Sequence, residues 1–251
     1  MPLLRMVSLD TGDQETLAAY TKISPDDSAA LGDIIPSLVG KRILHVSSSA
    51  RGGGVAELLR SSCMFERMLG IESSWAVIED ASDFFVVTKK IHNGLQGAVH
   101  TLTPDEQDTY FHVAPLLQEH FGTIVRNLKP DLIILHDPQP LPLISQARQF
   151  APVIVRLHID LSTPYKPMVK MLMSMIQQSS RVILSSSNYR AAIVPYPEDR
   201  TDIIRPAIDP LVEKNIPLER DAAKDILTRH GIDTSHHSSR KYPASTYGKT
   251  Q

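Results

Sequence analysis

Three short segments of this chain contain most of the candidate catalytic and ligand-binding residues. Residues 48–57 read SSARGGGVAE and place three consecutive glycines between a predicted buried strand and a predicted helix. HDPQP at 136–140 and HIDLS at 158–162 place histidine, carboxylate, amide and hydroxyl groups directly after apolar runs. Free backbone N–H groups at a glycine turn suit a phosphate or a sugar hydroxyl, whereas carboxylates and amide oxygens accept hydrogen bonds from hydroxyls. These segments predict a binding site for a polar ligand.

The glycine run favours a ligand loop over a tightly packed turn, because side chains at three positions would block a ligand from the backbone. A P-loop needs Lys-Ser/Thr after the glycines, but Val55-Ala56 follows, so a P-loop ATPase is excluded. A dinucleotide fingerprint would continue from Gly54 to a third glycine, where this chain has Glu57. Glu79 ends the second predicted strand, where a ribose-binding acid would sit. An NAD-dependent oxidoreductase therefore remains an alternative.

Other site chemistries find less support in the residue types and spacings. The histidine and aspartate pairs lack a third ligand at a known metal-motif spacing, so we predict no metal site. A G-x-S-x-G nucleophile elbow is absent from the sequence. The only cysteine, Cys63, is predicted to be an apolar core residue. His92, His112 and His120 are predicted to be surface or packing residues.

The elements that position these segments follow an alternating pattern. Short apolar runs, rich in β-branched residues, alternate with longer amphipathic ones. This pattern predicts an α/β fold with a Rossmann-like open, mostly parallel sheet, in which helices cover both faces. The predicted strands are 43–46, 74–78, 131–136, 152–158, 181–185 and 201–206; the predicted helices start at 55 and cover 110–128, 165–178 and 218–229.

Helix boundaries have their own signals. Gly70 is predicted to end the helix that follows the glycine run, in a left-handed conformation. Thr103 is predicted to cap the next long helix, with Pro104 in its first turn and Asp105 and Glu106 near the positive end of its dipole.

The pattern divides the chain into four parts. Residues 1–40 are polar and weakly patterned and are interpreted as an N-terminal extension, with helices near 14–20 and 28–38. The Rossmann-like domain covers 41–217, and 218–231 form a linker helix. Residues 232–251 contain few apolar side chains, so we expect a disordered tail.

Composition limits the partners. The chain has 251 residues and a formal net charge of -2, so no overall field attracts nucleic acid or an anionic membrane. The N-terminus lacks a signal-peptide pattern, and no apolar run approaches the roughly 20 residues of a membrane span. A single cysteine agrees with a reducing compartment. We expect a cytoplasmic protein that recognises small molecules.

Six segments, in order, carry a family resemblance: HVSSSARGGGVAELL, GIESSWAVIED, FFVVTKKIHNGLQG, LIILHDPQP, RLHIDLSTP and AIDPLVEKN. Together they resemble the N-terminal half of the trehalose glycosyltransferring synthases, which are retaining glycosyltransferases with the GT-B fold. The related trehalose phosphorylases are similar in the same region. The resemblance covers about 41–231, and the pairing of HDPQP with RLHIDLS is specific to this branch.

The resemblance implies transfer of glucose from a nucleoside diphosphate glucose to C1 of free glucose, without a cofactor or metal. By motif, His158 would be the catalytic residue beside the reacting sugar, and Gly53 and Gly54 would let the backbone approach the donor. The remaining candidates are hydroxyl acceptors for glucose: Glu79, Asp137, Gln139 and Asp160. The expected partners are small-molecule sugars, and a homodimer is left open.

The sequence departs from the family pattern at its end. Relatives continue into a second domain with a basic Ser-Arg-Phe-Asp type motif and a Glu-x7-Glu segment, which bind the donor; neither follows Gly231 here. The printed chain is therefore interpreted as an N-terminal half that is inactive alone. A trehalose phosphorylase-like enzyme and a non-catalytic sugar- or nucleotide-binding module remain alternatives.

Overall fold

The computed structural model describes residues 2–232. The predicted tail at 232–251 lies outside these residues, apart from its first residue. Contacts divide the chain into two compact units, Met1–Asp209 and Pro210–Gln251. The second unit contributes helix α8 (Arg220–Arg229), close to the predicted 218–229. No described helix combines the length and hydrophobicity needed to cross a bilayer.

The described strands of the first unit form one seven-stranded sheet, in the order β1-β3-β2-β4-β5-β6-β7. All neighbours are parallel except β1, which pairs antiparallel with β3. This confirms the predicted open, mostly parallel α/β sheet. The strands are β1 (Leu3–Met6), β2 (Arg42–Ser47), β3 (Glu72–Glu79), β4 (Leu132–His136), β5 (Val153–Leu157), β6 (Arg181–Leu184) and β7 (Thr201–Ile203).

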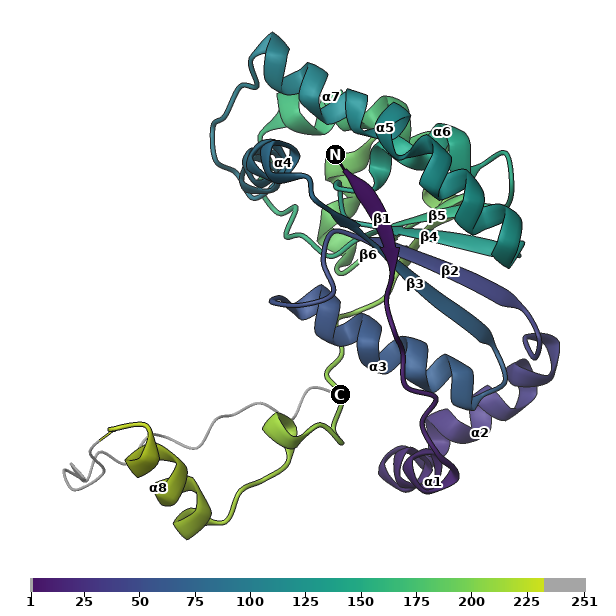
Figure 1. Ribbon diagram of the computed structural model, residues 1–251, viewed down its shortest axis with the longest axis vertical. Coiled ribbons are helices and arrows are strands. Elements are labelled where there is room, and N and C mark those ends of the chain that lie inside the picture. The colour runs from purple at the N-terminus through teal and green to yellow at the C-terminus, as the bar shows by residue number, and fades with distance from the viewer. Residues whose placement is uncertain (1, 233–251) are drawn as a thin grey trace. The chain divides into compact units, whose positions relative to one another are not determined.

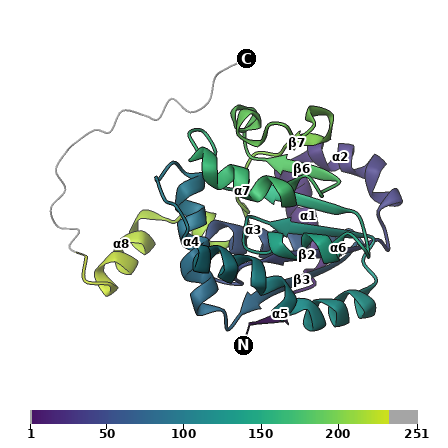
Figure 2. The same cartoon turned by 90° about the horizontal axis from the view of Figure 1, so that it is seen from above.

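Helices cover both faces of the sheet (Figure 1). The helix α3 lies on one face together with α1 and α2, and α4 to α7 lie on the other. In Figure 2 the second group is nearer the viewer and the strands lie behind it. The helices of this unit are α1 (Gln14–Ile23), α2 (Pro25–Ile34), α3 (Gly54–Met68), α4 (Ser82–Leu95), α5 (Pro104–Leu128), α6 (Ile144–Ala147) and α7 (Lys166–Ile176).

The core is divided by the sheet in the same way. A small cluster under α3 includes the fully buried Trp75 and Cys63, which confirms the apolar core position predicted for the cysteine. A larger cluster under α4, α5 and α7 includes Tyr110 and Phe121. Burial of large apolar side chains on both faces explains why the strands read as nearly continuous apolar runs.

Local signals start and end these helices as predicted. The hydroxyl of Thr103 accepts a hydrogen bond from the amide of Glu106, and the Glu106 carboxylate accepts one from the amide of Thr103. This reciprocal capping box fixes the start of α5. Gly70 follows α3 with φ +82°, a left-handed conformation that glycine adopts without strain.

Residues 1–40 differ from the predicted N-terminal extension in one respect. The predicted helices form as α1 and α2, but the strand β1 was not predicted, and it completes the sheet edge by pairing with β3. These residues therefore belong to the same compact unit as the sheet. The unit ends at Asp209, whereas the sequence pattern places the domain end at 217.

Candidate functional site

The strand order locates the candidate site. From β2 the chain adds β3 on one side, then returns across β2 to place β4 on the other. Such an open sheet has a switch point between β2 and β4, where the loops leaving the carboxyl ends diverge and ligands bind. The glycine loop follows β2, and HDPQP follows β4. The topology thus brings two of the three sequence-predicted segments to one switch point.

A cavity of about 730 Å³ opens at these strand ends. Its size lies within the range of small-molecule sites. Its walls come from the loop after β2, the end of β3, the helix α4 and the loop after β4. The lining residues are Ser48, Ser49, Ala50, Val77, Ile78, Glu79, Asp80, Phe85, Thr88, Lys89, His92 and Gln139.

The glycine loop has open space beside it. A Cβ added to Gly52, Gly53 or Gly54 would meet no heavy atom within 4 Å. Only Gly52 has a left-handed backbone, with φ +75°. Packing therefore does not explain Gly53 and Gly54, which precede and begin α3. All three glycines are exposed, and they leave the N-terminal amides of α3 accessible.

Two predicted sugar-binding residues line the cavity, with different surroundings. The side-chain oxygen Oε1 of Gln139 is buried and has no hydrogen-bond partner among the described residues. A buried acceptor of this kind costs about 1–3 kcal/mol until a donor reaches it. The Glu79 carboxylate instead forms a half-exposed ion pair with the Nε of Arg5 on β1, at 2.6 Å.

Asp137 and His158 connect the loops after β4 and β5. The Asp137 carboxylate accepts a hydrogen bond of 2.7 Å from the backbone amide of His158. Burial raises the pKa of Asp137 to about 7, although the amides of His158 and Ile159 and the charge of Arg156 oppose this rise. Asp137 also has φ +64°, a conformation that aspartate tolerates better than most residues. Its carboxylate therefore holds the loop that contains His158.

The Asp160 side chain accepts hydrogen bonds within its own loop. Its carboxylate accepts hydrogen bonds from the amide of Ser162 at 2.8 Å and from the Ser162 hydroxyl at 2.6 Å. These hydrogen bonds lower its pKa. The side chain is exposed and is not among those that line the cavity. Its predicted contact with glucose stays a prediction.

A row of three imidazoles, which the sequence analysis did not single out, crosses the sheet. The Nδ1 of His45 on β2 lies 3.0 Å from the Nε2 of His136, the last residue of β4. The Nδ1 of His136 lies 2.9 Å from the Nε2 of His158, which follows β5. The neighbouring rings are stacked, with centroids 5.3 Å apart in both pairs. At the inner end of the row, the Glu66 carboxylate lies 3.1 Å from the Nε2 of His45.

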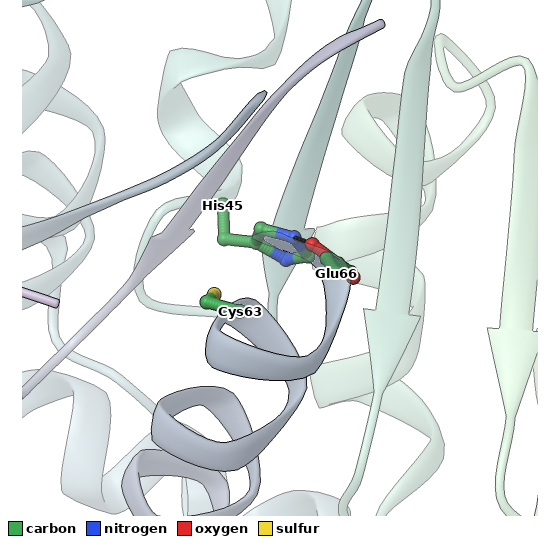
Figure 3. Close-up of side chains that lie close together, drawn as sticks. All are labelled: His45, Cys63 and Glu66. Atoms are coloured by element: carbon green, nitrogen blue, oxygen red, sulfur yellow. Dashed lines mark hydrogen bonds and ion pairs between the residues drawn. The ribbon is translucent and has the colours of Figure 1, made fainter. Parts of the chain in front are cut away.

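The inner end of this row contains three metal-ligand atom types. Figure 3 shows the ring of His45 beside the Glu66 carboxylate, with Cys63 on the same helix. One ligand atom from each residue lies within 4.8 Å of the other two. However, burial raises the pKa of the Cys63 thiol to about 12, and His45 and Glu66 already bond to each other. We therefore assign His45 and Glu66 to the hydrogen-bonded row and Cys63 to the apolar core, rather than to a metal site.

Other residues of the site were missed by sequence reasoning. Lys89 and His92, one turn apart on α4, both line the cavity. His92 thus lies at the surface of the cavity, and its expected role as a surface or packing residue stays a prediction. Burial lowers its pKa, which favours the neutral ring. The signal for α4 was weak, because its apolar residues are interrupted by Lys89 and Lys90.

Fold and geometry thus define a doubly wound α/β protein with a polar site at its switch point. The family model described as "Trehalose synthase, N-terminal domain" matches residues 45–191. The chain belongs to this family, which is a family of trehalose-related glycosyltransferases.

The chain is similar to several individual proteins. The trehalose synthase of Pyrococcus horikoshii is 33% identical over 84% of this chain and 50% of its own length. A trehalose phosphorylase of Pleurotus pulmonarius is 30% identical over 48% of this chain and 18% of its own length. The chain spans about half the length of the curated trehalose synthases that it matches. Among solved structures, an α,α-trehalose-phosphate synthase (UDP-forming) from Burkholderia vietnamiensis is 17% identical, with a TM-score of 0.46, over 64% of this chain and 43% of that one.

Proposed function

We propose that the cavity at the switch point binds glucose as the acceptor of a glycosyl transfer. The observation that carries this proposal is the buried, unpartnered Oε1 of Gln139 in the cavity wall. A sugar hydroxyl is the kind of donor that such an oxygen lacks, and a built site leaves acceptors unpaired until its ligand arrives. Glu79 can accept a second hydroxyl, and the Lys89 ammonium can donate to a sugar oxygen.

We propose further that the whole protein transfers glucose from a nucleoside diphosphate glucose to this acceptor, with retention of configuration. In a front-face transfer the leaving diphosphate takes the acceptor proton, so the protein needs no nucleophile. It contributes position and charge stabilisation instead. In this proposal His158 lies beside the reacting sugar, and the open backbone at Gly53 and Gly54 receives the donor. No cofactor or metal enters the scheme.

The isolated polypeptide is proposed to bind sugar without completing the transfer. It spans about half the length of the trehalose synthases it resembles, and that resemblance puts the diphosphate-binding residues in the other half. A phosphorylase is the second candidate, because three relatives are named trehalose phosphorylases. Inorganic phosphate as a co-substrate separates the two reactions. Membership of the trehalose synthase family does not favour the NAD-dependent alternative.

Isothermal titration with glucose tests the acceptor site. The test variant is Gln139→Leu, which keeps the side-chain size but removes the acceptor oxygen. We expect its glucose binding to be weaker by about 2- to 10-fold, because one hydrogen bond is lost. Gln118→Leu is the matched control, since Gln118 is exposed on α5 and does not line the cavity. Equal affinities for the two variants, or no glucose binding by the unmodified chain, would contradict the proposal.

A further inference from the structure

The histidine row follows from sheet topology. His45 is opposite Ile134 in the β2–β4 register, and His136 is opposite Arg156 in the β4–β5 register. Each histidine therefore lies two residues further along its strand than the position opposite the previous one. Residues two apart on a strand share a face, so the three rings form a diagonal line on the α3 side. The line runs from the buried middle of the sheet to its carboxyl edge.

The row contains one hydrogen per contact, and this determines its polarity. At a pH where all three imidazoles are neutral they carry three N–H hydrogens, and the row has three contacts: Glu66 to His45, His45 to His136, and His136 to His158. A carboxylate can only accept, so the Nε2 of His45 must donate to Glu66. The Nδ1 of His45 is then a lone pair and must accept from the Nε2 of His136. By the same rule the Nδ1 of His136 accepts a hydrogen bond from the Nε2 of His158.

The charges around the row favour this arrangement. Burial raises the pKa of Glu66, but the hydrogen bond from His45, with Ser73 and Arg156, lowers it further than burial raises it, so the carboxylate stays ionised. Burial lowers the pKa of His136 well below its usual value and that of His158 to about 4, which keeps both rings neutral. The other titratable and charged groups facing the row are Arg156 on β5, Asp137 after β4 and Cys63 on α3.

We propose that Glu66 is a positioning residue for His158: acting through His45 and His136, it fixes the tautomer of His158 so that Nδ1 is a hydrogen-bond acceptor. Nδ1 of His158 makes no hydrogen bond to any residue in the described part of the chain. It is the end of the row at the sheet edge. A protonated Glu66 would reverse every contact and turn the same atom into a donor. The ligand that this atom meets, a sugar hydroxyl, rests on the proposed function.

Histidine tautomers can be read directly by long-range ¹H–¹⁵N NMR on protein labelled with ¹⁵N-histidine. Near neutral pH we expect His45, His136 and His158 to be protonated at Nε2 only. In Glu66→Gln the neutral amide can either accept or donate, so we expect His158 to populate the Nδ1–H form as well. Glu119→Gln is the control. Glu119 is exposed on α5, so this substitution removes the same charge at a position away from the row. Its histidine spectrum should match that of the unmodified chain.

Two results would overturn the proposal. One is an Nδ1–H tautomer of His158 in the unmodified chain, which decides the question even if Glu66→Gln does not fold. The other is an unchanged His158 spectrum in a folded Glu66→Gln. Glucose titration adds a functional measurement. We expect Glu66→Gln to bind glucose about 2- to 10-fold more weakly than the unmodified chain, and Glu119→Gln to bind it with unchanged affinity. If the unmodified chain binds no glucose but shows the expected tautomers, the proposed function fails while the role of Glu66 in orienting the row stands.

Discussion

The carboxylate of Asp137 accepts a 2.7 Å hydrogen bond from the backbone amide of His158, and this bond joins the loops that leave β4 and β5. The two residues are 21 positions apart in sequence. They meet because β4 and β5 are parallel neighbours in register, so that their carboxyl ends reach the same edge. The candidate catalytic histidine is thus held through its backbone by one carboxylate and through its ring by the histidine row.

Asp137→Asn should change how stability depends on pH. Burial raises the pKa of the folded-state carboxyl to about 7, above the unfolded value of about 3.9. A raised folded pKa contributes stability that is complete below the unfolded pKa and is lost as pH rises through the folded one. The variant lacks this loss, so it should gain stability relative to the unmodified chain between about pH 4 and pH 7. Urea unfolding across this range measures the difference, and a trend of the opposite sign would contradict the assignment.

His136→Gln should destabilise the chain most at neutral pH. We expect a loss of about 1–3 kcal/mol near pH 7, because the buried His45 and the half-buried His158 lose well-oriented hydrogen bonds. The folded pKa of His136 is depressed by burial, so its neutral ring contributes stability that is present above about pH 6.5 and is lost as pH falls. The difference in unfolding free energy between the two proteins should therefore shrink on acidification. A difference that stays constant down to pH 5 would show that the ring is not buried in its neutral form.

Valine substitutions in the glycine loop should separate stability from ligand binding. Gly54→Val meets open space and should change the unfolding free energy by less than about 0.5 kcal/mol. Gly52→Val forces a β-branched residue to φ +75° and should cost about 1–3 kcal/mol. Thermal unfolding measures both costs.

The hypothesis that the glycine loop binds a ligand predicts a further effect of Gly54→Val. In the full-length protein we expect weaker binding of the nucleoside diphosphate glucose, since the added side chain blocks the backbone. Unchanged donor affinity, with stability also unchanged, would leave the glycine loop without a role in binding.

The 251-residue chain alone should form no trehalose from glucose and any nucleoside diphosphate glucose. The reason is that an uncompensated leaving diphosphate costs several kcal/mol in the transition state, if the groups that bind it lie in the other half of the relatives. Chromatographic detection of trehalose after prolonged incubation is the measurement. Product above the level of a His158→Ala control would disprove this expectation and assign the transfer to the present residues.

Much of the architecture was predictable, because it depends on local periodicity. The apolar runs at the six parallel strands, the Thr103 capping box and the stop at Gly70 are short-range patterns, and all appear in the structure. The strand at Leu3–Met6 was missed because four residues at a sheet edge carry little pattern of their own. Only pairing with β3 makes them a strand.

The site divides in the same way. Sequence alone identified Gly53, Gly54, Asp137, Gln139 and His158 as chemistry-bearing residues, since polar groups after apolar runs gather at the carboxyl ends of parallel strands. Their placement along one edge of the sheet needed the strand order, which no local pattern contains. Only the tertiary structure shows which partner each carboxylate has. The Asp160 carboxylate accepts a hydrogen bond from Ser162 in its own loop, and the Glu79 carboxylate forms an ion pair with Arg5.

The histidine row was decided by tertiary structure alone. His45 and His136 are 91 residues apart, and each adjoins an apolar run of its strand, a pattern that ordinary packing also produces. Their contact depends on which strands are neighbours and on a register offset of two residues, together with a glutamate from a helix on the same face. Sequence periodicity specifies the strands and helices, whereas long-range register, set by burial of both sheet faces, specifies which polar groups meet.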